Sequence, residues 1–228
     1  MNRTMKRLLT GKDSRQGRWF FALLIALAIV LWLGLTTERF LTSENLFNLV
    51  AQAMPLIITA IGMMLVVLVG GLDLSVGSVI SFTTAILALG APALISIPGV
   101  FALAAFIGLI NGLAVTRLNV HPIIATLSMQ FIVLGITRIL RPVSGGDMPQ
   151  IVIDAVAGSF YGIPLPVFWG IVTVLIAWKI IHGSRFGLHL FAIGGGIASG
   201  TDEATHNFGV ADKRKILLAY VGCSCFAA

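Results

Sequence analysis

A short polar stretch at residues 70–78, Gly-Gly-Leu-Asp-Leu-Ser-Val-Gly-Ser, separates two apolar runs that are each long enough to cross a bilayer. Asp73 is the only charged residue between positions 57 and 97, and a charge at membrane depth costs about 2.5–3.5 kcal/mol on insertion scales. Asp73 and Ser75 can each accept a hydrogen bond from the free amides that open the next helix. Two interpretations stay open: a tight turn in which Asp73 only caps a helix, and a break beside a ligand path.

Motifs for catalysis do not occur elsewhere in the sequence. The patterns GxxxxGK[ST], HExxH, CxxC and GxSxG are all missing. Cys223 and Cys225 lie in an apolar run without metal-ligand spacing or histidine partners, so we interpret them as packing residues. We therefore predict that the chain has no catalytic residues, binds no metal or cofactor, and does not hydrolyse ATP by itself.

The composition is that of an integral membrane protein. Of the 228 residues, 57% are hydrophobic and only 11% are charged, whereas soluble proteins carry about 25% charged residues. The predicted fold class is all-α, a polytopic membrane helix bundle of about six complete transmembrane helices plus a truncated seventh. A net charge of +6 could suggest nucleic acid, but the basic residues are not interleaved with aromatics on a soluble face, so we expect no nucleic-acid partner.

Basic residues set the expected topology instead. Residues 1–18 form a basic segment that should be cytoplasmic, and the run at 19–35 has no small-residue cleavage site after it, so we interpret it as an uncleaved anchor. Twelve of the fifteen Lys and Arg residues then fall on the cytoplasmic side, as the positive-inside rule requires. The longest polar segment, residues 183–215, is predicted to be a cytoplasmic loop.

The expected spans follow from the apolar runs. We place the first two at residues 19–35 and 46–69, the third from the break at residues 70–78 to about residue 97, and the others at residues 100–116, 122–140 and 167–181. Thr42 or Ser43 should cap the second span, and Pro98 with Gly99 should separate the third span from the fourth. The last run, residues 216–228, is too short to cross, so the chain looks cut off within a crossing.

Small and polar residues within the spans predict helix contacts. Two rows at four-residue spacing favour close packing: Gly77, Ser81 and Ala85 in the third span, and Ala104, Gly108 and Gly112 in the fourth. Asn48 and Gln52 should turn the second span toward the bundle interior, because polar groups in a span need internal partners. Asn111 is interpreted as forming an interhelical hydrogen bond, with a ligand contact as the alternative.

Three segments carry a resemblance to a known family. Residues 70–78 resemble the signature Gly-Gly-Ile/Leu-Asp-Leu-Ser-x-Gly of the permease subunits of bacterial ABC importers for monosaccharides, of the ribose, xylose, galactose and autoinducer-2 type. Residues 108–112 and 122–127 match two further family segments, although Ser128 stands where a glycine is usual. Residues 191–195 resemble the approach to the family's ATPase-contacting loop, with Gly196 in place of the usual Asn.

The resemblance implies a permease domain over residues 19–228, in the bacterial inner membrane with the N-terminus cytoplasmic, and part of the family fold missing at the C-terminus. It implies these partners: cytoplasmic ATPase subunits, a second permease copy or paralogue, a periplasmic or extracellular sugar-binding protein, and membrane lipid. Candidate path residues are Asn48, Gln52, Gly71, Asp73, Ser75, Asn111 and Thr126. Candidate residues of the ATPase coupling loop are Gly195, Glu203, Ala204 and Gly209.

The leading hypothesis is therefore a permease that provides the path for a monosaccharide or a similar polyhydroxy solute. Uncharged Asn, Gln, Ser and Thr side chains suit such a solute, which carries hydroxyls and no charge. A branched-chain amino acid permease of the same architecture is an alternative, and a truncated, non-transporting product is another. Ion-coupled transport is disfavoured, because Asp73 is the only acid within the spans that could bind a proton or sodium.

Overall fold

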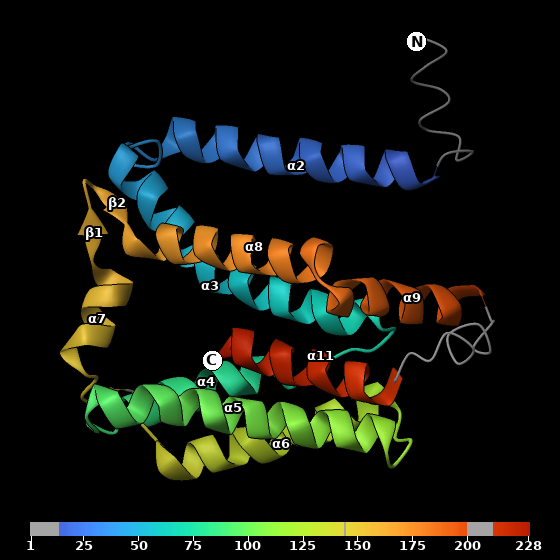
Figure 1. Ribbon diagram of the computed structural model, residues 1–228. Coiled ribbons are helices and arrows are strands. Elements are labelled where there is room, and N and C mark those ends of the chain that lie inside the picture. Colours follow the sequence, from blue (N-terminus) through green and yellow to red (C-terminus); the bar gives the residue numbers. More distant parts are fainter. Residues whose placement is uncertain (1–13, 144, 200–211) are drawn as a thin grey trace. The chain divides into compact units, whose positions relative to one another are not determined.

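The computed structural model describes residues 14–143, 145–199 and 212–228. The chain divides into two compact units, Met1–Leu49 and Val50–Ala228, and each unit is described by itself. Figure 1 shows that nearly all of the described secondary structure is helical. The predicted all-α fold class is confirmed.

The first unit contains helix α2, Ser14–Thr36, and the first residues of α3, Ser43–Leu68. Residues Phe20–Thr36 of α2 are apolar, and the helix has 23 residues, which gives a length of about 34 Å. At the start of α3 the hydroxyl of Thr42 accepts a hydrogen bond from the amide of Asn45, at 3.4 Å. Thr42 is therefore the capping residue, one of the two that the sequence predicted.

Among the described residues, the second unit contains the rest of α3, seven further helices and two short strands that form a hairpin. These elements are α4 (Val76–Leu87), α5 (Ala93–Thr116), α6 (Pro122–Leu140), α7 (Gln150–Ala157), β1 (Ser159–Phe160), β2 (Ile163–Pro164), α8 (Leu165–Gly183), α9 (Arg185–Ser199) and α11 (Asp212–Ala227). Strands β1 and β2 pair in antiparallel orientation around a turn that contains Tyr161 and Gly162, both with positive φ.

Four of the described helices are long and apolar enough to cross a membrane: α3, α5, α6 and α8. Shorter apolar helices occur at Phe20–Thr36 and Val76–Leu87. These elements correspond to the six runs predicted as spans. The polytopic helical bundle is confirmed, and the number of complete crossings stays a prediction.

The third crossing differs from the expected one. Helix α4 ends at Leu87 rather than near residue 97, and α5 begins at Ala93 with Pro98 inside it. The turn instead uses Gly90, whose φ is +77°, and Pro92, which precedes the first residue of α5. Glycine tolerates this left-handed backbone and proline favours the position before a helix, so these two residues end the crossing. The predicted boundary at Pro98 is wrong.

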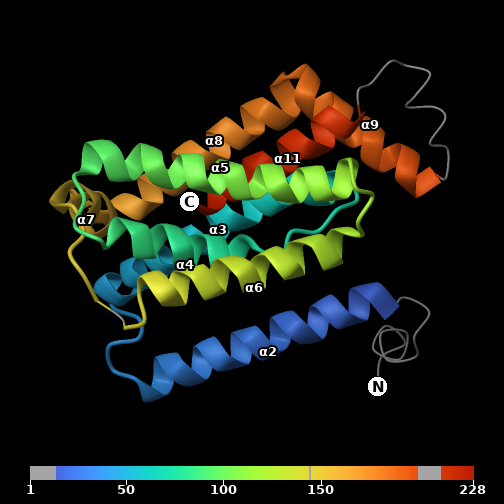
Figure 2. The ribbon, with the colours of Figure 1, turned by 90° about the horizontal axis from the view of Figure 1, so that it is seen from below.

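A non-helical link supplies the missing length of this crossing. Helix α4 has 12 residues and so a length of about 18 Å, which is shorter than the roughly 30 Å hydrocarbon core. Residues 71–75 precede α4 without helical structure and can span at most about 17 Å. Figure 2 shows this link passing beside α6 before α4 begins. The link and α4 together have the length of one crossing, so the polar stretch is predicted to be part of a broken span.

Helices α5 and α11 pack closely in antiparallel orientation. A Cβ atom on Gly108 would lie 2.6 Å from the carbonyl oxygen of Tyr220, and one on Gly112 would lie 3.0 Å from the Cα atom of Leu217. Ala104 on the same row is fully buried. The close contact predicted for Ala104, Gly108 and Gly112 is confirmed, because only small residues allow the two backbones to approach so closely.

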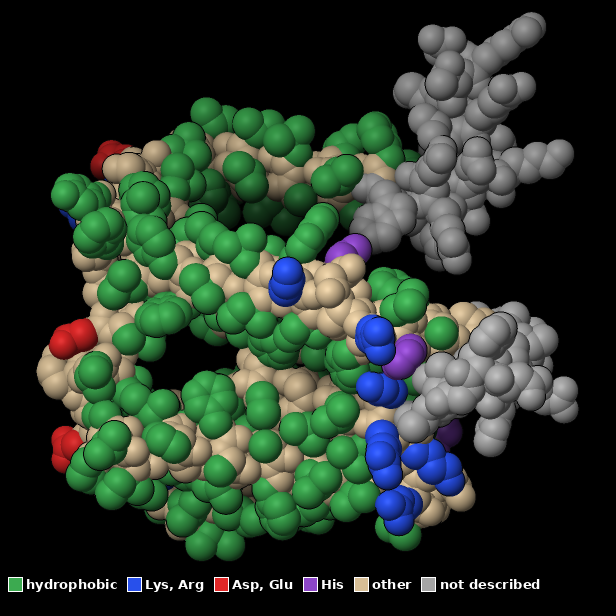
Figure 3. All heavy atoms as spheres, viewed as in Figure 1, with side chains coloured by type: hydrophobic (Ala, Val, Ile, Leu, Met, Phe, Trp, Pro, Cys, Tyr) green, Lys and Arg blue, Asp and Glu red, His purple; other side chains and the backbone are tan. Residues whose placement is uncertain are grey.

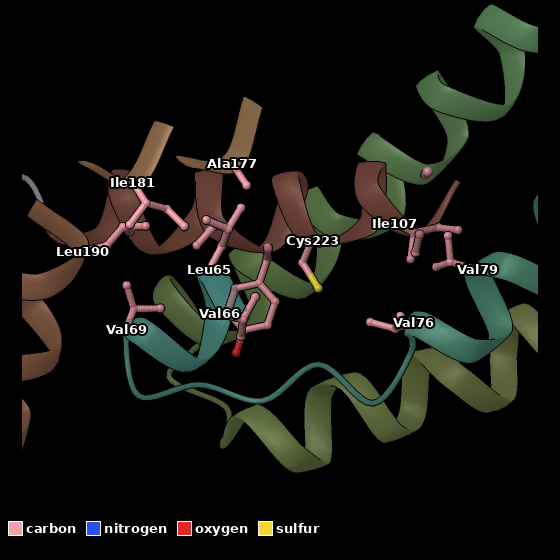
Figure 4. Close-up of a cluster of buried hydrophobic side chains, with 14 of the residues drawn as sticks. Leu65, Val66, Val69, Val76, Val79, Ile107, Ala177, Ile181, Leu190 and Cys223 are labelled. Carbon is pink, nitrogen blue, oxygen red and sulfur yellow. The ribbon is translucent and has the colours of Figure 1, made fainter. Parts of the chain in front are cut away.

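The apolar core of the second unit lies around this contact. It joins side chains from α3, α4, α5, α6, α8, α9 and α11, and Figure 4 shows Leu65, Val66, Val79, Ile107 and Cys223 among them. Cys223 is fully buried, in agreement with its interpretation as a packing residue.

The small-residue row predicted on α4 is not a packing surface within the described residues. Gly77 and Ser81 are exposed, and a Cβ atom on Gly77 would have no described atom within 4 Å. The buried face of α4 instead includes Val76, Val79 and Thr83. Packing of another helix on Gly77 and Ser81 therefore stays a prediction. The polar contacts at the start of α4 orient the helix so that the face with Val76, Val79 and Thr83 points to the core.

Candidate functional site

The link between α3 and α4 is held by a buried cluster of three polar side chains. Asp73 and Ser75 are fully buried, and Asn111 of α5 is 1% exposed. The Oδ1 atom of Asp73 accepts hydrogen bonds from the amide of Ser75 at 2.9 Å and from its hydroxyl at 2.6 Å. The side-chain amide of Asn111 donates to the hydroxyl oxygen of Ser75 at 2.8 Å. The interhelical hydrogen bond predicted for Asn111 is present.

Asp73 and Ser75 differ in how they serve the start of α4. Asp73 accepts the amide of Ser75, the residue just before the helix, and so holds the turn that leads into α4. The predicted hydrogen bond from a free amide of α4 itself to Asp73 is not formed. Ser75 occupies the N-cap position but makes no side-chain capping bond, because its hydroxyl is already engaged by Asp73 and Asn111. The capping role predicted for Ser75 is therefore wrong. Its hydroxyl connects α4 to α5.

Thr126 of α6 forms hydrogen bonds with backbone groups of the link. Its hydroxyl oxygen accepts the amide of Leu74 at 3.1 Å, and its hydroxyl proton faces two carbonyl oxygens, those of Pro122 at 2.9 Å and Leu72 at 3.4 Å. A buried backbone amide without an acceptor costs roughly 1–3 kcal/mol. Thr126 is fully buried, so its hydroxyl gives the amide of Leu74 an acceptor inside the protein.

Tyr220 of α11 contacts the same link from another side. Its hydroxyl lies 3.5 Å from the carbonyl oxygen of Leu72, at the outer limit of a hydrogen bond, and its side chain is fully buried. A Cβ atom on Gly71 would lie 2.6 Å from this hydroxyl. Gly71 is therefore needed for the close approach of the link to α11. The sequence analysis missed Tyr220, although it is the only tyrosine in the last apolar run.

We call the residues Asp73, Ser75, Asn111, Thr126 and Tyr220 the polar lock. They join the link to α4, α5, α6 and α11, and each is fully buried or nearly so. The second carboxylate oxygen of Asp73 has no hydrogen-bond partner among the described residues. The start of α4 offsets part of the cost of this charge, because the positive end of a helix dipole favours a carboxylate. The polar lock therefore stabilises non-helical backbone at membrane depth.

The side chains of the polar lock do not form a recognisable catalytic set. They are a carboxylate, two hydroxyls, an amide and a phenol, with no histidine or thiol in hydrogen-bond contact with them. In the described part of the chain no group of three His, Cys, Asp or Glu residues could hold a metal ion. The arrangement can fix a backbone conformation and can bind polar groups by hydrogen bonds.

A separate cavity of about 830 Å³ opens within the second unit. Helices α3, α4, α7 and α8 and the end of α11 line it, and Figure 3 shows an opening beside α7 at this position. Its polar lining is uncharged and consists of Gln52, Thr59, Thr83, Thr84 and the ring of Trp169, among apolar side chains. Thr83 and Thr84 had not been predicted. Their hydroxyls bond to carbonyls of their own helix.

The structure thus divides the candidate path residues. Asp73, Ser75, Asn111 and Thr126 come together in the polar lock with Gly71 beside them, whereas Gln52 lines the cavity. Asn48 belongs to the first unit and is exposed there. Of the coupling-loop candidates, Gly195 lies on α9, and Glu203, Ala204 and Gly209 lie outside the described residues.

Comparison with known proteins decides the family. Residues 45–228 match the family described as "Branched-chain amino acid transport system / permease component", which covers the polar lock and the cavity. The chain belongs to this permease family.

Several relatives of the permease are named for the sugars that they import. The ribose import permease protein RbsC of Escherichia coli strain K12 is 33% identical over 232 residues, which cover 98% of this chain and 70% of the relative. RbsC of Haemophilus influenzae is 34% identical, with 83% of this chain and 60% of the relative covered. The galactose/methyl galactoside import permease protein MglC of Escherichia coli strain K12 is 30% identical, with 94% and 68% covered. No solved structure matches the chain.

Family membership settles the class of protein. The permease is a multi-pass protein of the inner membrane, as its apolar helices of spanning length also indicate. It is the membrane component of a transport system and is not itself an enzyme. The family description and the relatives' names imply that other components complete the system.

Proposed function

We propose that this permease provides the translocation path of an ATP-driven importer for a monosaccharide or a similar small polyhydroxy solute. The observation that carries the substrate class is the lining of the cavity, which contains no charged side chain and does contain Gln52, Thr59, Thr83 and Thr84. Such groups hydrogen-bond to hydroxyls without requiring a charge on the solute. The relatives named for ribose, allose and galactose support the same class.

A branched-chain amino acid is the second candidate, since the family description names that substrate. An amino acid is a zwitterion, and its carboxylate and ammonium groups would need charged or helix-end partners in the path. The cavity offers no charged side chain, and the one acid of the polar lock is sealed from solvent. The sugar is therefore the better substrate for this chain.

The polar lock gives this function a mechanical basis. Import by alternating access requires that packed helices move between two arrangements as rigid bodies. If the neighbouring helices moved and the non-helical link did not, the hydrogen bonds that hold the link would break. Thr126, Asn111 and Tyr220 connect the link to three different helices. We infer that these four elements move as one block beside the path.

The other components follow from the same proposal. Cytoplasmic ATPase subunits would drive the movement, a second permease copy or paralogue would complete the pathway, and an external sugar-binding protein would deliver the solute. Glu203, Ala204 and Gly209 are proposed to form the loop that contacts the ATPase, with Gly195 at its approach. ATP-driven closure of the ATPases would shift this loop and switch the pathway between its inward-facing and outward-facing states.

Charge placement supports a cytoplasmic N-terminus. Arg117 follows α5, Arg185 begins α9, and Lys213 lies in the first turn of α11, so these cations gather at one end of the second unit. Asp154 lies within α7, and Figure 3 shows Asp and Glu side chains at the end of the unit opposite the gathered Lys and Arg side chains. Cations on the cytoplasmic side are the expected pattern. The basic residues 1–18 would lie on that side as well.

Affinity purification from host membranes tests this proposal. The permease, produced at native level from its own gene, should retain an ATPase subunit and a sugar-binding protein, both identified by mass spectrometry. Recovery of an amino-acid-binding protein would favour the second candidate. Recovery of the permease without any ATPase would contradict the proposed importer.

A further inference from the structure

Six basic residues lie at the end of the second unit where α5 and α8 finish and α9 and α11 begin. We call this surface the basic end, and its residues are Arg117, Lys179, Arg185, Lys213, Arg214 and Lys215. All are exposed except Lys215, which is half-buried. Figure 3 shows Lys and Arg side chains gathered toward this end of the unit.

Packing contacts bring these residues together from separate parts of the chain. Gly112 of α5 packs on Leu217 of α11, and the two helices run in opposite directions. Arg117 lies after Gly112 in α5, and Lys213 lies before Leu217 in α11. Because the helices are antiparallel, both residues lie about 6–8 Å beyond the contact, toward the same end of the unit. The ammonium group of Lys215 lies 5.7 Å from the ring centre of Phe186. That contact places the start of α11 beside the start of α9, where Arg185 lies.

Helix α8 adds a cation to the same surface. Gly187 of α9 packs against the backbone of Ile181 in α8, so the end of α8 meets the start of α9. The side chain of Lys179 lies along α8 toward Gly183, the last residue of the helix. This is the course of a lysine that directs its charge from the apolar region toward the membrane surface.

Among residues 20–143, 145–196 and 213–228, whose side chains the structure describes, the cations of the basic end form no ion pair with a carboxylate. Three of the cations are consecutive, Lys213, Arg214 and Lys215. Like charges at such density repel one another unless an anion lies among them. The basic end therefore has the electrostatic character of a surface that binds an anion.

The depth of the surface indicates what kind of anion reaches it. Trp178 of α8 is 65% exposed and stacks on His182, with ring centres 4.6 Å apart. Exposed tryptophan is typical of the headgroup region of a bilayer. Lys179 is the next residue along the same membrane-length helix. Lipid phosphates lie at this depth, whereas a soluble partner approaches from the aqueous side.

We propose that the basic end binds the phosphate groups of anionic phospholipids of the cytoplasmic leaflet. Basic surfaces between transmembrane helices on that side are suited to such headgroups. The inference goes beyond the proposed import of a sugar, and it rests on the proposed orientation of the permease in the membrane. The bound lipid would link α5, α8, α9 and α11 at the end of the bundle that faces the ATPase.

Native mass spectrometry of the purified chain, with phosphatidylglycerol and phosphatidylcholine titrated in parallel, tests the proposal. The triple variant Lys213→Gln, Arg214→Gln, Lys215→Gln should bind phosphatidylglycerol roughly a hundredfold more weakly, at a factor of about five for each lost cation. The variant Lys179→Gln should bind it about fivefold more weakly. It serves as a second test if the triple variant does not fold.

Two controls separate a specific surface from general charge. The charge-conserving variant Lys213→Arg, Arg214→Lys, Lys215→Arg should retain wild-type binding. So should Arg138→Gln, which removes an exposed cation from the last turn of α6. Millimolar inorganic phosphate should not displace the lipid.

Four results would overturn the proposal. They are equal binding of the two lipids by the wild type, unchanged binding in both the triple variant and Lys179→Gln, an equal loss in Arg138→Gln, and displacement by inorganic phosphate. If the triple variant kept its lipid but released the ATPase subunit in a pull-down, the basic end would be a protein-binding surface instead.

Discussion

The side-chain amide of Asn111 donates a hydrogen bond of 2.8 Å to the hydroxyl of Ser75, and this bond joins the C-terminal part of α5 to the residue that precedes α4. The same hydroxyl donates to Asp73 at 2.6 Å. A shift of α4 along α5 would break the hydrogen bonds that this buried hydroxyl accepts from Asn111 and donates to Asp73, so these bonds oppose the shift. The short helix is therefore fixed at its first turn, although it has only 12 residues.

Replacement of Asp73 by leucine should lower both the folded yield and uptake. The leucine removes the acceptor of the Ser75 amide, and each unpaired buried group costs roughly 1–3 kcal/mol. Asp73→Asn keeps an oxygen at this position and should fold better than Asp73→Leu. Fluorescence-detected gel filtration measures the yield. Wild-type yield and uptake for Asp73→Leu would rule out a role for Asp73 in holding the turn before α4.

Thr126→Val should destabilise the permease by roughly 1–3 kcal/mol, because the amide of Leu74 loses its acceptor. Thr126→Ser should restore most of the stability. Thr137→Val is the matched control, since the hydroxyl of this buried threonine bonds only to a carbonyl of its own helix. Thermal unfolding in detergent compares the three variants. Equal losses for Thr126→Val and Thr137→Val would mean that Thr126 does not hold the link.

Gly71→Ala and Tyr220→Phe should be coupled. The alanine methyl group would lie 2.6 Å from the Tyr220 hydroxyl, so the single variant Gly71→Ala should lose stability. Removal of the hydroxyl gives that methyl group space, so the double variant should recover part of the loss. A double-mutant cycle of unfolding free energies measures the coupling. Strict additivity would contradict the contact between the link and α11.

Gly108→Ala should destabilise the bundle by roughly 1–3 kcal/mol, because its methyl group would force α5 away from the backbone of α11. Gly135→Ala on α6 is the control. A Cβ atom there meets no described atom within 4 Å, and alanine favours a helix by about 1 kcal/mol over glycine. Unfolding in detergent should show opposite signs for the two variants, and a harmless Gly108→Ala would refute the α5 and α11 contact.

Glu203→Lys should weaken the retention of the ATPase subunit in a pull-down from membranes, if Glu203 belongs to the coupling loop. Asp202→Lys makes the same change of charge one residue earlier and serves as the control. Unchanged retention in Glu203→Lys would remove this residue from the proposed loop. Equal losses in both variants would point to the general charge of the segment.

The sequence predicted the features that depend on local pattern. A single acid among apolar residues located the link at Asp73, and four-residue spacing located the contact at Gly108. The end of the third crossing was misplaced, because Pro98 was interpreted as a helix breaker although it fits within the first turns of α5. Tyr220 could not be predicted, because its contact with Leu72 joins residues 148 positions apart. No local periodicity records such a pairing.

Uptake by host cells with the gene intact or disrupted tests the proposed function most directly. Cells with the intact gene should accumulate at least one labelled monosaccharide from a panel of ribose, allose and galactose, and unlabelled sugar should compete whereas leucine should not. Disruption should abolish that uptake and leave labelled leucine uptake unchanged. Loss of leucine uptake with all sugar uptake intact would contradict the account.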